Sequence, residues 1–251
     1  MSAKIITVAL QKGGSGKSST AQNTAAILGY KGHKTLLVDF DSQSNASIAS
    51  GIYEPQLTVS HVLSEECSIK DAITSLALYD VIPSDITLAN FDVYSDEIPA
   101  DLLHQRLMDI REDYEYIVID SPPSLNNLLK NALCASDFVI VPMQPRPFDI
   151  RGIDDLTITL KEVQAKTGRA KIIGILLCRY NKRSVLNKAV EQQAAQIAEE
   201  LGTSLFDAKI RDSVVVGEAQ AAGHPLIEYA PKAAITLDFM FFVGELLGRI
   251  S

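Results

Sequence analysis

Short apolar runs alternate along most of the chain with longer segments whose apolar residues recur at helical spacing. Runs of this length are typical of buried strands, and the chain contains them at Ile5–Leu10, Lys34–Asp39, Tyr79–Pro83, Tyr114–Asp120, Phe138–Pro142 and Lys171–Cys178. The segments with helical spacing are Ala21–Tyr30, Leu102–Ile110, Leu125–Cys134, Gly152–Thr167, Ser184–Leu201 and Ala233–Ile250. This alternation predicts an α/β fold, a doubly wound, mostly parallel sheet flanked by helices.

The region from residue 53 to residue 101 is the least regular part of the chain. We predict short helices over Leu57–Leu63 and Ile69–Leu76, whereas Ile86–Val93 fits neither a helix nor a strand clearly. No motif in this region indicates chemistry. Its lone histidine, His61, is more typical of a packed or surface residue than of a metal ligand.

Length and composition change this picture little. The 251 residues suit one large α/β domain, so we predict a single domain over residues 1–251. Hydrophobic residues make up 47% and charged residues 22% of the chain, which is typical of a folded protein. No apolar run is long enough to cross a membrane, and the first strand begins with no signal sequence before it. We therefore expect a cytoplasmic protein.

Charge and cysteine content exclude some classes of protein. The net charge is −8, so any binding of nucleic acid has to come from a local basic patch, most simply in an oligomer. The three cysteines, Cys67, Cys134 and Cys178, lack C-x-x-C spacing. They predict neither a disulfide framework nor a metal site.

A glycine-rich loop between the first predicted strand and the first predicted helix carries the strongest functional signal. Glycines let backbone N–H groups turn toward an anion, and the helix that follows directs its positive dipole end to the same place. We predict that this loop binds the phosphates of a nucleotide through Lys12, Gly13, Gly14, Ser15, Gly16, Lys17, Ser18 and Ser19. Lys17 would reach the outer phosphates, and the Ser18 hydroxyl would hold Mg²⁺.

Two predicted strands end in carboxylates at the edge of the sheet where doubly wound folds bind ligands. Asp39 ends one strand and is followed by Asp41, while Asp120 ends another in a Walker B pattern, where the acid holds Mg²⁺ through a water. We therefore place Ser18, Asp39 and Asp120 at the metal. Asp39 and Asp41 are also compatible with the cap of the next helix, which uses the same residue types.

The loop resembles the deviant Walker A motif of the ParA/MinD ATPases, with Lys12 at the position of their signature lysine. The loop departs from the standard Walker A pattern because the first glycine of that pattern falls at Gln11. Residues 39–45 and 120–123 are similar to the switch segments of the family, with Ser42 in place of the usual proline, and the likeness covers nearly the whole chain. It implies a homodimer that holds two ATP molecules between its subunits.

The resemblance also implies roles for single residues. Lys12 would reach across to the phosphates of the partner subunit, and Asp41 would orient or deprotonate the attacking water. Lys17 joins them as a catalytic candidate. An asparagine just after the strand at 171–178 often contacts adenine in this class, which makes Asn181 our candidate for the base. The segment 218–223 would lie near the nucleotide.

One stretch of the acidic chain is densely basic. From Arg179 to Lys188 there are four cations and no acid. Such a cluster can follow DNA phosphates without reading sequence, or it can be the solvated start of a helix, and counting charges favours neither. Our candidates for DNA contact are Lys182, Arg183, Lys188 and Arg211.

The family resemblance implies a function as a ParA-type partition ATPase. We expect the short kind, because the loop begins near residue 10 of this sequence, which leaves no room in it for a preceding DNA-binding domain. It implies an ATP-bound dimer that binds double-stranded DNA nonspecifically on the nucleoid, with a ParB-like centromere-binding partner that stimulates slow hydrolysis. Alternatives are a MinD-like membrane ATPase, an ATPase that positions another cargo, and a protein that holds ATP without hydrolysing it. Asp238 and Glu245 in the last helix argue against membrane binding.

Overall fold

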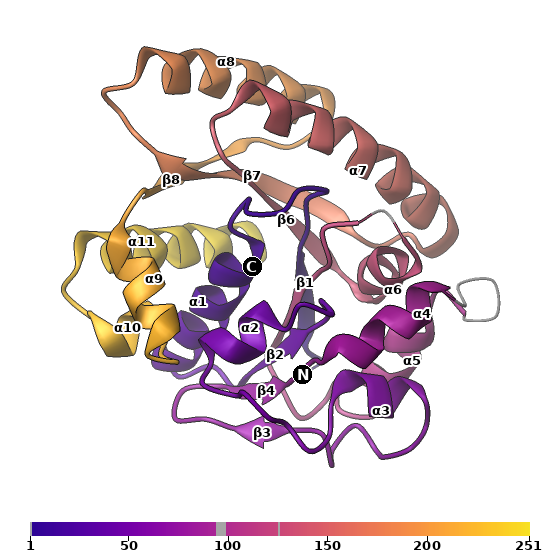
Figure 1. Cartoon of the computed structure of the whole chain (residues 1–251). Coiled ribbons are helices and arrows are strands. Elements are labelled where there is room, and N and C mark those ends of the chain that lie inside the picture. Colours follow the sequence, from indigo (N-terminus) through magenta and orange to yellow (C-terminus); the bar gives the residue numbers. More distant parts are fainter. Residues whose placement is uncertain (1, 94–98, 125) are drawn as a thin grey trace.

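The computed structural model describes residues 2–93, 99–124 and 126–251. In these residues the strands form one eight-stranded sheet in the order β3-β4-β2-β5-β1-β6-β7-β8 (Figure 1). Their bounds are β1 (Lys4–Val8), β2 (Thr35–Asp39), β3 (Thr74–Ser75), β4 (Asp80–Ile82), β5 (Tyr116–Asp120), β6 (Phe138–Met143), β7 (Lys171–Tyr180) and β8 (Leu205–Arg211). Neighbouring strands are parallel except for β3 and β4. The predicted doubly wound, mostly parallel sheet is confirmed.

Helices cover both faces of the sheet (Figure 1). Their bounds are α1 (Lys17–Tyr30), α2 (Asn45–Ala49), α3 (Val59–Leu63), the 3₁₀ helix η1 (Ile86–Ala89), α4 (Asn90–Val93), α5 (Leu102–Met108), α6 (Asn127–Ala135), α7 (Pro147–Thr167), α8 (Val185–Glu200), α9 (Val214–Ala221), α10 (Leu226–Tyr229) and α11 (Ala234–Arg249). Helices α1, α10 and α11 share one apolar cluster with the sheet, whereas α3, α5, α6, α7 and α8 pack on the opposite face.

The central strands are buried on both sides, which explains their nearly continuous apolar sequences. In β1, Ile6 and Val8 pack toward α1 and α11, while Ile5 packs toward α3 and α5. Neighbouring side chains of a strand point to opposite faces, so a strand covered by helices on both faces needs apolar residues at every position. This arrangement fixes the strand ends that carry the site.

Some predictions for the irregular region were wrong. Residues Ile69–Leu76 do not form a helix: turns lead into β3, which pairs antiparallel with β4. Ile69 and Ala72 are both buried, and this spacing of three resembles one turn of a helix. However, the Ser68 hydroxyl and N–H both donate to the Asp71 carboxylate, which holds a turn instead.

Other elements also differ from the sequence-based expectation or lie partly outside the described residues. Strand β8 was not predicted at all, and α7 begins at Pro147, five residues before the predicted Gly152. The ambiguous stretch 86–93 forms η1 and then α4. The predicted start of another helix, Leu125, lies outside the described residues, and α6 is described from Asn127.

In the part of the chain that the structure describes, no helix combines the length and the apolar character that crossing a membrane requires.

Candidate active site

The strand register brings three functional segments to one edge of the sheet. Strand β5 lies between β1 and β2, and Asp120 at its end pairs in register with Val8 of β1 and with Asp39 of β2. The glycine-rich loop continues from β1. The two strand-end carboxylates and the loop therefore meet, as predicted from the parallel order of the strands.

The loop has the backbone conformation of an anion cradle. Gly14 and Gly16 have φ angles of 74° and 98°, which only glycine adopts without strain. Gly16 precedes α1, and no side chain caps the N-terminus of this helix. The first N–H groups of α1 thus remain available to a phosphate, and the buried Ser15 hydroxyl has no hydrogen-bond partner of its own.

Neighbouring elements hold the loop in place. The Gln144 side chain, after β6, donates to the Gly14 carbonyl at 2.5 Å. On α7, Gly152 approaches so closely that an added Cβ would lie 3.2 Å from the Gln11 carbonyl oxygen. On α9, Gln220 donates to the Ser19 hydroxyl at 2.9 Å. The cradle is therefore built from β6, α7 and α9 as well as from its own sequence.

Lys17 is buried and faces carboxylates. Its ammonium group donates to the Lys12 carbonyl at 2.9 Å, inside the loop itself. Burial lowers the pKa of Lys17, and the nearby charges of Asp120 and Asp41 oppose that shift. A phosphate group in the loop would give this cation a stronger partner than a neutral carbonyl.

Asp39 is buried and held by hydrogen bonds. Its Oδ2 accepts from the Ser47 N–H at 2.7 Å and from the Ser47 hydroxyl at 2.6 Å, and its Oδ1 accepts from the Asp41 N–H at 3.2 Å. Burial raises the pKa of Asp39 to about 6, and the hydrogen bonds from Ser47 work against that rise. Ser47 belongs to α2, so Asp39 also binds the first turn of this helix. The alternative reading of Asp39 as a helix cap is therefore partly confirmed.

Asp120 is a buried carboxylate whose charge is only partly compensated by its described neighbours, Ser18 and Lys17. Neither of its oxygens has a hydrogen bond of ordinary geometry, although the Ser18 hydroxyl lies near enough to lower its pKa. Burial, and then the charge of Asp39, raise the pKa of Asp120 well above its ordinary value. Two buried acids beside a hydroxyl fit a hard divalent cation such as Mg²⁺, which also keeps water and phosphate oxygens as ligands.

Asp41 stands at the entrance to the site. Its Oδ1 accepts from the Gln43 N–H at 3.1 Å, and burial raises its pKa against the effects of that bond and of Lys17. A carboxylate with a raised pKa can accept a proton more readily than an exposed one. This is the property that the predicted role beside the attacking water requires.

A cavity of about 390 Å³ opens over the loop. Seven of the predicted site residues line it: Gly13, Gly14, Gly16, Lys17, Ser18, Ser19 and Asp41. Gln43, Asn45 and Pro123 of the two switch segments also line it, together with Arg179 and with Gln220, although none of these five had been predicted as a site residue. Gln220 lies in the segment 218–223, which was expected near the nucleotide.

Arg179, not Asn181, borders the phosphate cavity. Asn181 instead lines a neighbouring cavity with Lys182 and Arg211, and its side-chain oxygen accepts from the Arg183 N–H at 3.0 Å. Arg179 has a φ angle of 52°, which is unfavourable for a residue with a side chain and is found at functional sites. The sequence could have indicated Arg179, because it is a cation at the carboxyl end of a predicted strand.

The basic candidates differ in how their charges are compensated. Lys182, Arg183 and Lys188 are exposed at the start of α8 and, among the described residues, form no ion pair. Arg211 instead donates two hydrogen bonds, at 2.6 and 2.7 Å, to the carboxylate of Asp238 on α11. Its charge is therefore already partly neutralised.

Comparison with known proteins agrees with this geometry. The AAA domain family matches residues 3–173 of the chain. The chain is 34% identical to the chromosome partitioning protein ParA of Caulobacter vibrioides, over 98% of this chain and 94% of that protein.

Solved structures share the fold. Apo McdA of Cyanothece superposes with a TM-score of 0.87 and 25% identity, covering 98% of this chain and all of that one. A plasmid partition protein of Borrelia burgdorferi, bound to AMPPNP, gives a TM-score of 0.84 and 26% identity, covering 98% and 99% of the two chains. The chain therefore belongs to the AAA domain family and, within it, to the ParA-type partition ATPases.

Proposed function

We propose that this chain is an Mg-ATP-dependent ATPase that dimerises on ATP, binds DNA nonspecifically as a dimer, and partitions a plasmid or chromosome with a ParB-like partner. One observation supports ATP hydrolysis above all: the strand register pairs Asp39 with Asp120. The two acids lie beside the glycine-rich loop, and no side chain caps the helix that follows that loop. The assignment to partition of a plasmid or chromosome rests on the similar proteins named above. The same proposal places the protein in the cytoplasm on the nucleoid.

Binding of ATP begins with the loop. The N–H groups from Gly13 to Ser19 bind the phosphates, and the Lys17 ammonium exchanges the Lys12 carbonyl for a phosphate oxygen. Ser18, Asp39 and Asp120 would hold a magnesium ion, which would supply positive charge near the phosphate oxygens.

Hydrolysis then needs a positioned water. Asp41 lies in the same cavity as Lys17, and its carboxylate orients that water and accepts its proton. The hydrogen bond from the Gln43 N–H fixes the carboxylate for this task. Lys12 completes the site from the other subunit, where its charge stabilises the negative charge that develops on the transferred phosphoryl group.

The base-binding side of the site involves β7 and its end. Arg179 borders both the phosphate cavity and a small cavity of about 90 Å³ between β7, β8 and α9. We assign Arg179 to the base or ribose of ATP. Asn181 keeps its sequence-based assignment to the base and reaches it only if the loop after β7 rearranges.

DNA binding belongs to Lys182, Arg183 and Lys188. One subunit offers only a few phosphate contacts in an acidic chain, so its affinity for DNA is low. A dimer joins two such groups, and binding through both raises the affinity without any new motif. Arg211 contributes less, because Asp238 already neutralises it.

The experiment that tests this proposal measures binding to a random-sequence duplex by fluorescence anisotropy, with Mg-ATP and with Mg-ADP. Tight binding in ATP alone is the expected result. Anionic liposomes serve as a parallel target. Absence of DNA binding in both states would overturn the partition assignment, and liposome binding would then favour the MinD-like alternative.

A further inference from the structure

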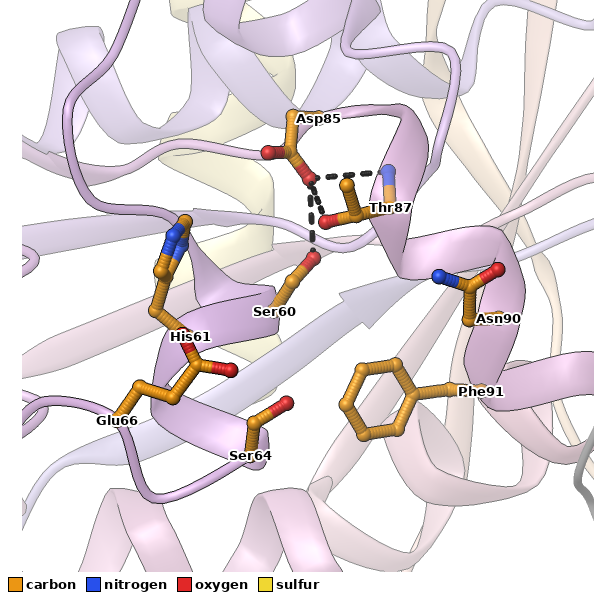
Figure 2. Close-up of a pocket in the computed structure, with 8 residues that line it drawn as sticks. All are labelled: Ser60, His61, Ser64, Glu66, Asp85, Thr87, Asn90 and Phe91. Carbon is orange, nitrogen blue, oxygen red and sulfur yellow. Dashed lines mark hydrogen bonds between the residues drawn. The ribbon is translucent and has the colours of Figure 1, made fainter.

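A second cavity lies on another part of the surface, beyond the carboxyl end of β4. Helices α3 and α4, the 3₁₀ helix η1 and the turn after α3 enclose about 440 Å³ (Figure 2). It shares no lining residue with the phosphate cavity. No sequence motif indicates it, because its residues are spread over 32 positions of the irregular region, from 60 to 91.

One wall of this cavity is an oriented carboxylate. A single oxygen of Asp85 accepts from the Ser60 hydroxyl at 3.1 Å and from the N–H and hydroxyl of Thr87 at 3.1 and 2.5 Å (Figure 2). Among the described residues, the other oxygen of Asp85 accepts no hydrogen bond. The carboxylate is thus fixed by one oxygen and can receive a donor at the other.

A second carboxylate and an imidazole lie nearby in the lining. Glu66 is exposed and forms no ion pair within the described part of the chain. The Nδ1 atom of His61 accepts from the Thr58 N–H at 3.2 Å, so in a neutral ring the proton is on Nε2. No lysine or arginine lines the cavity. Its field is therefore negative and suits a positively charged guest.

Phe91 defines what kind of cation fits. Part of its ring packs on the apolar cluster beneath α3 and α5, and the rest lines the cavity. An aromatic face attracts organic cations, and a planar guanidinium can stack on it while its N–H groups bind carboxylates. A metal ion is a poorer guest, since the histidine and the two acids of this lining do not form a metal-binding group: among the described residues, no three His, Cys, Asp or Glu side chains are grouped to hold a metal.

We propose that this cavity binds an arginine side chain that a basic segment of a partner protein presents. Asp85 and Glu66 accept from the guanidinium, and the Phe91 ring packs on its face. Ile86, next to Thr87 on η1, is 67% exposed and offers an apolar contact for the residue beside that arginine. A polypeptide can make both contacts at once, because Ile86 lies outside the cavity that holds the cation.

The cavity is connected to the nucleotide site by two hydrogen bonds. Ser84, which precedes Asp85, donates its N–H to the Ser47 hydroxyl at 3.0 Å, and that hydroxyl donates to Asp39. In addition, the N–H of Val59, at the start of α3, donates to the Pro83 carbonyl. Any shift of the Asp85 loop on binding therefore acts on a carboxylate of the ATPase centre.

The test uses the full ¹⁵N-labelled chain and the peptide acetyl-Gly-Arg-Gly-amide, followed by NMR. The peptide should shift amide resonances of residues 58–66 and 84–91 saturably, with a dissociation constant on the order of 1 mM. The same peptide with citrulline, which lacks the charge, should not. Glu66→Gln should weaken binding roughly threefold to tenfold, and Phe91→Leu about twofold to fivefold.

Glu54→Gln is the matched control, since it removes the same charge from an exposed glutamate outside the cavity. It should bind the arginine peptide as the unmodified chain does. Equal binding of the citrulline peptide, shifts confined to other residues, or Glu66→Gln behaving like Glu54→Gln would each overturn the proposal. None of these readouts depends on DNA binding or ATP turnover, so the proposed function can fail while this site stands.

Discussion

Lys12 is the residue that the proposed function assigns to the phosphates of a second subunit. Its backbone carbonyl accepts from Lys17 within the loop. We expect Lys12→Ala to keep much of the affinity for ATP, while hydrolysis falls roughly a hundredfold or more, as on loss of an arginine finger. ATP-dependent dimerisation should also be lost. A fluorescent ATP analogue, phosphate release and sedimentation measure the three properties.

The exposed Lys161 of α7 provides the matched control for that experiment. Lys161→Ala removes the same charge away from the site and should leave all three properties unchanged. Normal turnover by Lys12→Ala would contradict the shared active site. Loss of ATP binding as well would mean that Lys12 acts within its own subunit.

Asp39 makes the stability of the ligand-free protein depend on pH. Its pKa is about 6 in the folded chain, against an ordinary value of 3.8, so the folded state holds this proton more tightly than the unfolded state. Stability from this group is complete below pH 4 and is lost as the pH rises through 6. The loss amounts to at most about 3 kcal/mol. The raised pKa of Asp120 acts in the same direction.

Urea unfolding in EDTA at pH 4.5 and pH 7 tests this effect in the unmodified chain and in Asp39→Asn. An asparagine cannot ionise, so the free energy of unfolding should fall less between the two pH values in the variant. Any cost of the altered hydrogen bonds from Ser47 is the same at both pH values and cancels. Identical pH dependence in the two proteins would show that Asp39 titrates normally.

At the scale of elements, two glycines connect α2 to α9. Gly51 and Gly223 have φ angles of 78° and 71°, and a Cβ on Gly223 would lie 2.7 Å from the Gly51 Cα. Helix α2 follows Asp41, and α9 contacts Ser19 through Gln220. The contact therefore joins the two helices on either side of the nucleotide cavity.

Gly223→Ala should destabilise the protein more than its backbone angle alone explains. Gly202 has a similar φ of 67° but nothing within 4 Å of an added Cβ, so Gly202→Ala measures the backbone term, roughly 1–2 kcal/mol. Overlap with Gly51 should add about 1–3 kcal/mol in Gly223→Ala. Urea unfolding measures both. Equal losses would mean that α2 and α9 separate without cost.

The elements that the sequence predicted best are those whose signal is local. Strands β1, β2 and β5 have continuous apolar runs because both faces are covered, and the acids Asp39 and Asp120 mark their ends. Strand β8 lacks the continuous apolar run of the central strands: it lies at the end of the sheet, and its apolar residues alternate with polar ones, a half-buried strand pattern that was not recognised. Its Asp207 and Ala208 N–H groups donate to Glu245 on α11, a residue nearly forty positions away that no local pattern reveals.

The same limit explains the site. Glycine spacing identified the phosphate loop, because the backbone alone forms it. Gln144 and Gln220 reach that loop through tertiary packing. The family resemblance placed the segment of Gln220 near the nucleotide, but no local pattern indicated either hydrogen bond. Arg179 was grouped with its basic neighbours in sequence, yet the left-handed turn at this residue separates it from them.

For the whole molecule, an excess of eight negative charges has to be overcome before DNA binds. Of the sequence-based candidates, the exposed cations Lys182, Arg183 and Lys188 form no ion pair among the described residues, whereas Arg211 pairs with Asp238. If two subunits each contribute them, changing Arg183 and Lys188 to Glu should abolish most ATP-dependent DNA binding. The salt dependence of the remaining binding, as log K against log salt concentration, should become shallower by about 1 for each lost phosphate contact.

Arg211→Gln separates a specific patch from general charge in that experiment. It removes one positive charge per subunit, but Asp238 already neutralises this arginine, so it should weaken DNA binding much less than Lys188→Gln. Anisotropy titrations in Mg-ATP at several salt concentrations measure both affinity and salt dependence. If the two single variants behave alike, net charge governs binding and the α8 patch has no special role. If only Lys188→Gln flattens the salt dependence, the phosphates of DNA contact the start of α8.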